Sequence, residues 1–415
     1  MSKLAIKGGV QCVPKKYQNF KHPKITKDFF KRLQDEKFQN EICSFDSPVV
    51  SDFQEEAKKL FNLKHVLPTN SGTSALFEMF YALGLEPGDE VIVPSYTFFA
   101  TGTPLFVLKC IPVLVDATDN GNIDPKDIER KITTKTKAIV ITHMWGIPCD
   151  MDEIIKISKK YKVPILEDAS HAHGATYKGR VIGTFGVCSA WSLGAKKLIT
   201  GGQGGMLGTN NKEIYQKAVL FGHANNKRIK EITIKNLLPY SVSGTGLNLR
   251  IHPFSAGVIT EQMKEYPKQM RERQEVADYL ISEIEKIPGS GLPRIPKGSN
   301  PSWYGFPIFF DTDFFKGVDK ETFVSALNAE GATSFDVPHT TSPLTEYPVF
   351  NERGVFFERI KEIKKYYQKG DFKQTELFNK RVFKLTLWYG DNRMNYAKYH
   401  ILALQKVIKN IGELR

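Results

Sequence analysis

Long apolar segments are missing from this sequence. None of its apolar runs approaches the length of a membrane-spanning helix, and residues 1–6 lack the apolar core of a signal peptide. Internal repeats, low-complexity tracts and Ser/Gly-rich linkers are missing as well. With 415 residues, 41% of them apolar and 25% charged, the chain has the composition of a soluble globular protein and is long enough for two domains.

Cysteines are few, and their spacing does not pair them. They are scattered, odd in number and without any Cys-x-x-Cys motif: Cys12, Cys43, Cys110, Cys149 and Cys188. This pattern argues against a disulfide framework and against a cysteine zinc site, and it fits a reducing compartment. We therefore expect a cytoplasmic protein that has no metal site.

Acidic residues are outnumbered by basic ones. The chain has 58 Lys and Arg against 45 Asp and Glu, which gives a net charge of +13. The basic residues are spread along the chain, and neither zinc-finger spacing nor an RNA-binding aromatic motif is found. We therefore do not expect nucleic acid as a partner. A small anionic substrate or cofactor stays open, as does a generally lysine-rich composition.

Short apolar runs alternate with helical patterns between residues 50 and 220. The helical periodicity predicts a helix that begins near Ser51, where Ser-Asp-Phe-Gln is typical of a capping box, and further helices over 75–83 and 151–161. The apolar runs predict strands at 65–67, 90–94, 111–116, 137–143 and 163–168. This alternation favours an α/β fold with a mostly parallel sheet and helices on both faces. In such a fold the ligand lies beyond the carboxyl ends of the strands.

The pattern changes after about residue 250. The periodicity predicts helices over 259–287, 319–330 and 396–411, and strand-like apolar segments lie at 303–310 and 383–388. These elements favour a smaller α+β domain.

Three regions follow from these patterns. We expect an N-terminal arm over residues 1–50, a large cofactor-binding domain over 51–250 and a small domain over 251–415. The arm is Lys-rich and irregular. We expect it to lie over the body or a neighbouring subunit, as part of the substrate site or of a dimer contact.

Polar and aromatic side chains follow the predicted strands. The turn at 71–73 comes between a strand and a helix, where free N–H groups and a hydroxyl can bind an anion, although a plain helix cap explains the turn as well. Phe98 could stack on a flat ligand or pack in the core. Asp168 ends another strand, and His171 follows it. Because such strands end at one edge of a sheet, one ligand site could collect these residues.

The segment 192–205 is the most unusual stretch of the chain. It places Ser192, Lys196 and Lys197 after an apolar run and then turns on four glycines. A lysine in a partly desolvated pocket loses part of its charge and becomes a nucleophile. Taken alone, a solvated pair of lysines is the commoner explanation.

Together these residues match the needs of pyridoxal 5′-phosphate. This cofactor requires an anion cradle, an aromatic ring to stack on, a carboxylate beside its ring nitrogen and a lysine that bonds to its aldehyde. Ser71 and Ser192 can contribute to the cradle, Phe98 can supply the ring, and Asp168 can supply the carboxylate. The lysine would be Lys197, which becomes a base once a substrate amine displaces it. We therefore predict Lys197 and Asp168 as catalytic residues.

The chain also resembles the DegT/DnrJ/EryC1/StrS family of pyridoxal phosphate-dependent aminotransferases, fold type I enzymes that act mostly on keto sugars. The resemblance is dense from about residue 50 to 290 and traceable to the C-terminus. The segments that carry it are in register: 70–76, 87–94, 97–101, 143–146, 149–152, 167–174, 192–205 and 246–250.

The resemblance implies a role for individual residues. The family lysine lies five residues after the motif serine, which selects Lys197 over Lys196. Asn248 resembles an asparagine that reaches the cofactor phosphate of the other subunit, with Arg250 close by, and this implies a homodimer with shared active sites. The remaining cofactor-binding residues that the resemblance implies are Gly72, Thr73 and Ser192 for the phosphate, Phe98 for the ring, Asp168 for the ring nitrogen and His171 for the O3′ side.

The sequence departs from the family pattern in three places. Gln203 stands where the family usually has Glu or Asp, residues 222–226 match only loosely, and residues 331–380 are the least alike. We expect substrate choice to lie in 331–380 and in the arm. Three further side chains could line the pocket or serve packing: Trp303, Tyr304 and His339.

By resemblance, the activity is transfer of an amino group from L-glutamate or L-glutamine to a keto sugar. The sugar is expected to be nucleotide-linked or phosphorylated, in polysaccharide or natural-product biosynthesis. A small keto phosphate or a keto-cyclitol is the alternative acceptor. A sugar 3-dehydratase of the same fold is disfavoured, because a histidine replaces the lysine in that branch. A non-catalytic sensor that binds the cofactor is supported only by Gln203.

Overall fold

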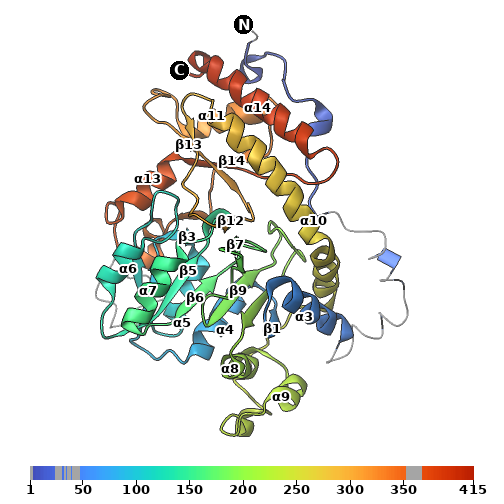
Figure 1. Ribbon diagram of the computed structural model, residues 1–415, viewed down its shortest axis with the longest axis vertical. Coiled ribbons are helices and arrows are strands. Elements are labelled where there is room, and N and C mark those ends of the chain that lie inside the picture. The colour runs from blue at the N-terminus through green and yellow to red at the C-terminus, as the bar shows by residue number, and fades with distance from the viewer. Residues whose placement is uncertain (1–2, 24–29, 32–33, 35–38, 40–46, 352–366) are drawn as a thin grey trace.

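The computed structural model of the chain describes residues 3–23, 30–31, 34, 39, 47–351 and 367–415. Cys43, much of the predicted arm and part of the 331–380 segment lie outside the described residues. A large sheet with helices on both faces forms the lower part of Figure 1, and smaller sheets with their helices form the upper part. The chain is therefore an α/β protein, as predicted.

The large sheet has seven strands in the order β1-β10-β9-β6-β5-β2-β4. β10 pairs antiparallel with both of its neighbours, whereas the other neighbouring strands pair parallel. The prediction of a mostly parallel sheet is therefore confirmed. The strands are β1 (His65–Thr69), β2 (Glu90–Pro94), β4 (Ile111–Val115), β5 (Thr136–Thr142), β6 (Ile165–Asp168), β9 (Cys188–Ser192) and β10 (Gly205–Thr209).

Strand β5 shows why both faces of the sheet are covered. Successive strand residues point to opposite faces, so Ile139 and Ile141 join one hydrophobic core while Ala138 and Val140 join another. Helices α3 and α7 pack on the first face, and α4, α5 and α8 pack on the second. The helices of this region are α3 (Pro48–Phe61), α4 (Gly72–Leu83), α5 (Thr103–Val107), α6 (Pro125–Lys131), α7 (Met151–Tyr161), α8 (Lys212–Gly222) and α9 (Asn225–Glu231).

Helix α3 begins earlier than the sequence pattern predicted. Its first residue is Pro48, and Ser47 occupies the cap position without a side-chain bond, so Ser51 lies inside the helix. A proline at the first helical position has a fixed φ that suits the helix and lacks an N–H that would stay unbonded. This proline outweighs the capping-box motif, and the predicted start was wrong.

The C-terminal part of the chain has its own hydrophobic core. An antiparallel sheet of order β11-β13-β16-β14 lies against helices α11 and α14. The strands of this sheet and the α-helices of this part are β11 (Ser290–Gly291), β13 (Phe306–Phe310), β14 (Phe335–Asp336), β16 (Val382–Leu385), α11 (Lys320–Ala329), α12 (Pro348–Asn351), α13 (Lys373–Arg381) and α14 (Arg393–Lys409). Two small ribbons complete the fold: β12 (Ser299–Asn300) with β7 (Thr176–Tyr177) and β8 (Arg180–Val181), and β15 (Thr341–Pro343) with β3 (Tyr96–Phe98).

Helix α10 (Pro253–Ile284) connects the two parts of the molecule (Figure 1). Ile259 packs into the core of the large sheet, and Leu280 packs into the C-terminal core. Because one helix serves both cores, the division at residue 250 stays a prediction. Among the residues that the structure describes, no helix is long and apolar enough to cross a membrane.

The described part of the N-terminal arm packs on the C-terminal core. Leu4 and Val13 are buried there, and the N–H groups of Ala5 and Cys12 donate to the carboxylate of Glu330 at 2.8 and 3.1 Å. Figure 1 shows the arm beside α14, and the N–H of Leu4 donates to the carboxylate of Glu413 near the C-terminal end at 3.0 Å. The arm therefore lies against the body of its own chain over residues 3–23.

Candidate active site

A cavity of about 400 Å³ lies at the carboxyl ends of the parallel strands. Residues that end or follow β1, β2, β5, β6 and β9 line it. Asn248 is exposed and does not line this cavity. The other predicted cofactor-binding residues come together around it: Gly72, Thr73, Phe98, Asp168, His171, Ser192 and Lys197.

One end of the cavity is built to receive an anion. Ser71 caps α4 by accepting a hydrogen bond from the N–H of Ser74 at 3.1 Å, so the N–H groups of Gly72 and Thr73 begin the helix without partners inside it. A Cβ on Gly72 would lie 2.6 Å from the Cβ of Ser192, so only glycine allows this approach. The hydroxyl of Ser192 therefore lies next to the positive end of the helix.

Asp168 faces the cavity from the end of β6. Its carboxylate accepts hydrogen bonds from Oγ1 of Thr101 at 2.7 Å and from the N–H of Ser170 at 3.1 Å, which fix its orientation. The preceding acid, Glu167, points to the other face of the strand and accepts from Nε2 of His143 at 3.2 Å. Of the two acids that end this strand, Asp168 is therefore the one available to a ligand.

An aromatic stack forms one wall of the cavity. The rings of His171 and Tyr304 lie 4.0 Å apart and nearly parallel, and Trp145 continues the stack at 5.7 Å from His171. Burial lowers the pKa of His171 well below its usual value, so the imidazole is neutral. Within the described residues, its Nδ1 has no hydrogen-bond partner. A ligand atom could therefore bond there.

Lys197 is the nucleophile that this cavity offers. Burial lowers the pKa of its amine to about 8, and the Asp168 carboxylate limits that fall. Its Nζ lies 4.4 Å from the centre of the Tyr304 ring. Lys196 also lines the cavity but its side chain is exposed. A larger fraction of the Lys197 amine is thus neutral at neutral pH than for an ordinary lysine.

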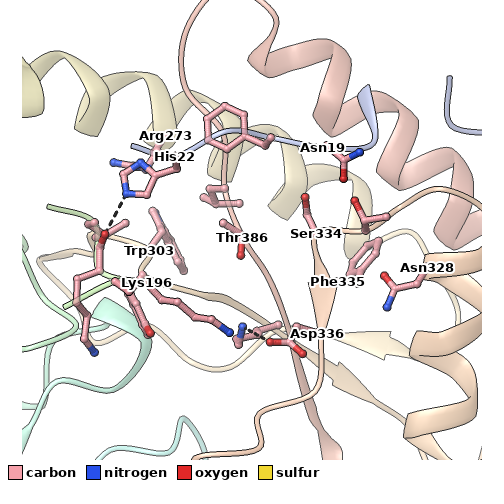
Figure 2. Close-up of a pocket in the computed structure, with 18 residues that line it drawn as sticks. Asn19, His22, Lys196, Arg273, Trp303, Asn328, Ser334, Phe335, Asp336 and Thr386 are labelled. Carbon is pink, nitrogen blue, oxygen red and sulfur yellow. Dashed lines mark hydrogen bonds and ion pairs between the residues drawn. The ribbon is translucent and has the colours of Figure 1, made fainter. Parts of the chain in front are cut away.

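A second cavity of about 560 Å³ adjoins the first (Figure 2). It shares Lys196, Lys197 and Tyr304 with the first cavity. Residues of the arm, of α10 and of the C-terminal part complete its walls, among them His22 and Arg273. No prediction from the sequence included His22 or Arg273.

A pattern in the sequence could have identified Arg273. In α10 the buried residues Tyr266, Arg273 and Leu280 follow one another at intervals of two helical turns. A charged residue at such a core position is uncommon and marks a candidate functional group. His22 carries no comparable signal, because it lies in an irregular segment.

Other residues singled out from the sequence lie in different places. Gln203 lines the first cavity and is exposed, Trp303 lines the second, and His339 lines neither. Asn248 accepts a hydrogen bond from Nε of Arg250 at 2.9 Å, and the next residue, Leu249, accepts one from the N–H of Asn70 at 2.7 Å. The segment around Asn248 therefore lies beside the end of β1 and outside both cavities.

The residues around the first cavity fit pyridoxal 5′-phosphate. The close approach of Gly72 to Ser192 leaves N–H and hydroxyl donors for a phosphate, and Asp168 offers an oriented carboxylate. Nδ1 of His171 has no partner in the part of the chain that the structure describes. Lys197 offers an amine of lowered pKa. Among the described residues, no group of three or more His, Cys, Asp or Glu side chains could hold a metal ion.

Several proteins of known name are similar to this chain. The spore coat polysaccharide biosynthesis protein SpsC of Bacillus subtilis is 32% identical over 68% of this chain and 73% of its own. GDP-perosamine synthase of Caulobacter vibrioides is 32% identical over 57% and 62%. A putative L-glutamine:3-amino-2,3-dideoxy-scyllo-inosose aminotransferase of Micromonospora echinospora is 30% identical over 69% and 68%. These relatives include enzymes named for amino sugars and for an amino-cyclitol.

The comparison with solved structures supports the same fold. The crystal structure of an aminotransferase from Psychrobacter cryohalolentis superposes with a TM-score of 0.78 at 24% identity, and the match covers 94% of this chain and 98% of that one. At this identity the likeness concerns the fold.

A family model settles the family. The model of the DegT/DnrJ/EryC1/StrS aminotransferase family matches residues 23–391, which is most of the chain. Enzymes of this family are aminotransferases that use pyridoxal phosphate, which confirms the predicted cofactor and reaction class. The chain therefore belongs to the DegT/DnrJ/EryC1/StrS family and is a pyridoxal phosphate-dependent aminotransferase of the sugar aminotransferase type.

Proposed function

We propose that this aminotransferase transfers the amino group of L-glutamate or L-glutamine to a keto sugar carried on a nucleotide, in the synthesis of a polysaccharide or natural product. The observation that carries the proposal is the first cavity, around which Lys197, Asp168 and the Gly72 turn come together. Pyridoxal phosphate, when bound there, supplies an electron sink that lets a substrate carbon lose its proton.

We propose that the protein holds the cofactor by complementary charge and shape. The N–H groups of Gly72 and Thr73 and the hydroxyl of Ser192 bind the phosphate at the start of α4. Asp168 holds a proton on the ring nitrogen, and its bonds to Thr101 and Ser170 keep it aligned.

Two aromatic residues complete the binding site in this proposal. Phe98 packs on one face of the cofactor ring, and the neutral His171 bonds on its O3′ side. Each of these roles is supported by the residue's position on the wall of the first cavity.

Lys197 moves the proton in the proposed reaction. An amine with a pKa of about 8 can accept a proton near neutral pH and release it again. In the donor half-reaction Nζ would take the proton from the α-carbon of the amino donor and would return it to the carbon that carried the aldehyde of the cofactor. The ring of Tyr304, 4.4 Å away, covers one side of the amine.

The proposal of a nucleotide-linked acceptor rests on the names of the relatives. GDP-perosamine synthase is named for a nucleotide-linked amino sugar, and the chain's net charge of +13 suits an anionic substrate. A keto-cyclitol is the second candidate acceptor, since the Micromonospora echinospora relative is named for an inosose derivative.

We further propose that two copies of the chain share their active sites. Asn248 is exposed and lies outside both cavities, so it is free to reach a site on another subunit. A hybrid experiment tests this: Lys197→Ala and Asn248→Asp proteins are mixed under conditions that exchange subunits. Since half of the dimers would be hybrids with one intact site each, about a quarter of the wild-type activity should return. No recovery would contradict shared sites.

The test of the proposed function uses both half-reactions. Holoenzyme is first incubated with L-glutamate or L-glutamine, and loss of the absorbance of the cofactor joined to Lys197 as an imine reports the donor step. GDP-linked and dTDP-linked keto sugars, a keto-cyclitol and a small keto phosphate are then added separately. Recovery of the absorbance with a nucleotide-linked sugar is the expected result. Recovery only with the keto-cyclitol or the keto phosphate would contradict the proposed acceptor.

A further inference from the structure

A buried cation that forms no ion pair with the described residues lines the second cavity. Arg273 is 2% exposed, and its Nε and Nη1 have no hydrogen-bond acceptor among the described residues. Its guanidinium carbon lies 4.7 Å from the centre of the Tyr389 ring and 6.0 Å from that of Tyr266. Aromatic faces stabilise a guanidinium, but they do not replace the hydrogen bonds it loses on burial.

The neighbouring carboxylates are engaged elsewhere. Asp336 is the one carboxylate among the described lining residues, and it pairs with Lys384 at 2.7 Å. Glu272, next to Arg273 in the chain, accepts a hydrogen bond from the N–H of Gly390 at 2.9 Å. A buried charge without a partner costs free energy. An anionic ligand that reaches Arg273 would therefore bind through the hydrogen bonds and the charge pairing that the guanidinium lacks within the protein.

Other charges around the second cavity also favour an anion. Lys196 and Lys384 line it together with Arg273, against the single carboxylate of Asp336. Figure 2 shows Arg273 at one end of this cavity, beside His22, with Asn328 and Asp336 at the other. A volume of about 560 Å³ is typical of a site for a small molecule.

His22 connects the Tyr389 ring beside Arg273 to the main chain of Lys197. Its Nε2 donates to the backbone carbonyl of Lys197 at 3.0 Å, and its Nδ1 accepts from the hydroxyl of Tyr389 at 3.1 Å. Burial lowers the pKa of His22 to about 4, so it adds no charge to the cavity. A series of contacts thus runs from the guanidinium to the Tyr389 ring, then to His22, and then to the backbone of Lys197.

We propose that Arg273 binds the anionic group, a carboxylate or a phosphate, of a reactant whose reacting carbon lies next to Lys197. The proposal rests on the proposed function, because it places one of the two reactants in the second cavity. The carboxylate would belong to the amino donor and the phosphate to the acceptor. A guanidinium suits both, because it offers parallel N–H donors to two oxygens.

Three variants test the role of Arg273. Arg273→Met removes the charge at similar length, Arg273→Lys keeps a charge, and Arg271→Met is the matched control on the exposed face of α10. The melting temperature of Arg273→Met should be no lower than that of the wild type, since loss of an unpaired buried charge does not destabilise a fold. If Arg273→Met fails to fold, Arg273→Lys carries the test, because a lysine cannot bind two oxygens side by side.

The first measurement uses L-glutamate. With holoenzyme, the L-glutamate concentration that gives half of the maximal rate of absorbance change is measured for each variant. If the donor carboxylate binds Arg273, this concentration should rise about 10- to 100-fold in Arg273→Met. A change of this size corresponds to the loss of one hydrogen bond to a charged group. Arg271→Met should match the wild type.

The second measurement uses inorganic pyrophosphate. Its affinity for each holoenzyme is measured by titration calorimetry. If Arg273 binds the phosphate of the acceptor, the affinity should fall about 10- to 100-fold in Arg273→Met while the response to L-glutamate is kept. A change in either measurement that is absent from Arg271→Met supports the proposal and names the reactant.

Two outcomes would overturn the proposal. One is that neither measurement changes in Arg273→Met, and the other is that Arg271→Met changes equally. Failure of the proposed function would be seen in a different measurement, because the absorbance of the wild-type holoenzyme itself would not change on addition of L-glutamate or L-glutamine. The pyrophosphate titration would still report on Arg273 in that case.

Discussion

The two cavities that meet at Lys197 are built in different ways. Most walls of the first come from segments that directly follow strands of one sheet, and Tyr304, Thr340 and Thr341 complete them. The walls of the second come from the arm, α10, β14 and β16, which are far apart in the sequence. In the first, the sheet itself brings the reactive residues together, whereas packing between the two cores creates the second. The first can therefore be predicted from local patterns, and the second requires the folded chain.

The largest effect is expected from removing the amine that both cavities share. Lys197→Ala should reduce transamination by roughly 10⁴-fold, because the variant loses both the nucleophile and the base. The absorbance of bound cofactor should revert to that of the free aldehyde. Steady-state rates and spectra measure both effects. Lys196→Ala is the matched control and should keep the wild-type spectrum, and normal turnover by Lys197→Ala would contradict the account.

The next largest effect is expected at the carboxylate of the first cavity. Asp168→Asn keeps the shape of the side chain but removes its charge, so the rate should fall by roughly 10²- to 10³-fold. Single-turnover rates of the donor half-reaction measure this. The comparison variant is Glu167→Gln, whose side chain faces away from the cavity and accepts hydrogen bonds from His143 and from the N–H groups of Gly183 and Gly186. Glu167→Gln should lower the melting temperature while the rate of the donor half-reaction stays near that of the wild type. A large loss of rate in Glu167→Gln, with a normal rate in Asp168→Asn, would mean that the two acids have been assigned to the wrong roles.

The pH dependence of cofactor attachment tests the charge on Lys197. Only the neutral amine attacks an aldehyde, and burial lowers the pKa of this amine to about 8. The rate at which apoprotein takes up pyridoxal phosphate should therefore rise with pH and level off above about 8. Asp168 opposes the fall in this pKa, so the midpoint should move to lower pH in Asp168→Asn. A midpoint near that of an ordinary lysine would contradict the burial of the amine.

The anion cradle offers a smaller but clear test. Gly72→Ala brings a Cβ within 2.6 Å of the Cβ of Ser192, and such overpacking costs about 1–3 kcal/mol. Affinity for pyridoxal phosphate should fall, as measured by titration of the apoprotein. Gly412→Ala is the control, because nothing lies within 4 Å of a Cβ added there. Equal affinity in the two variants would remove Gly72 from the phosphate site.

The smallest effect is expected in the second cavity at His22. His22→Ala loses two hydrogen bonds, each worth about 1 kcal/mol, so kcat/KM should change by no more than roughly 30-fold. Lys21→Ala, at an exposed neighbour, is the control. A loss as large as that of Lys197→Ala would break the distinction between the two cavities, since the arm would then belong to the catalytic machinery.

The sequence predicted the large sheet and the membership of the first cavity for a physical reason. Buried strands such as β5 are short apolar runs, and the residues that follow them must meet at one edge. Segment ends were less predictable, as α3 shows, because Pro48 and a capping motif at Ser51 compete locally.

The second cavity escaped prediction because its residues do not share a local pattern. His22 lies in an irregular arm, and it is 175 residues away in the sequence from Lys197, which it contacts. From the sequence, Tyr304 could line the pocket or serve packing, since an aromatic residue after a loop has no preferred role. Its ring contact with the Lys197 amine exists only in the folded chain.

The most direct test of the account locates the lysine that holds the cofactor. Holoenzyme is reduced with sodium borohydride, which fixes pyridoxal phosphate to the amine that carries it, and the digested protein is examined by mass spectrometry. The account predicts the added mass on Lys197, with Lys196 in the same peptide unmodified. The added mass on Lys196, or on no lysine of this segment, would contradict the account.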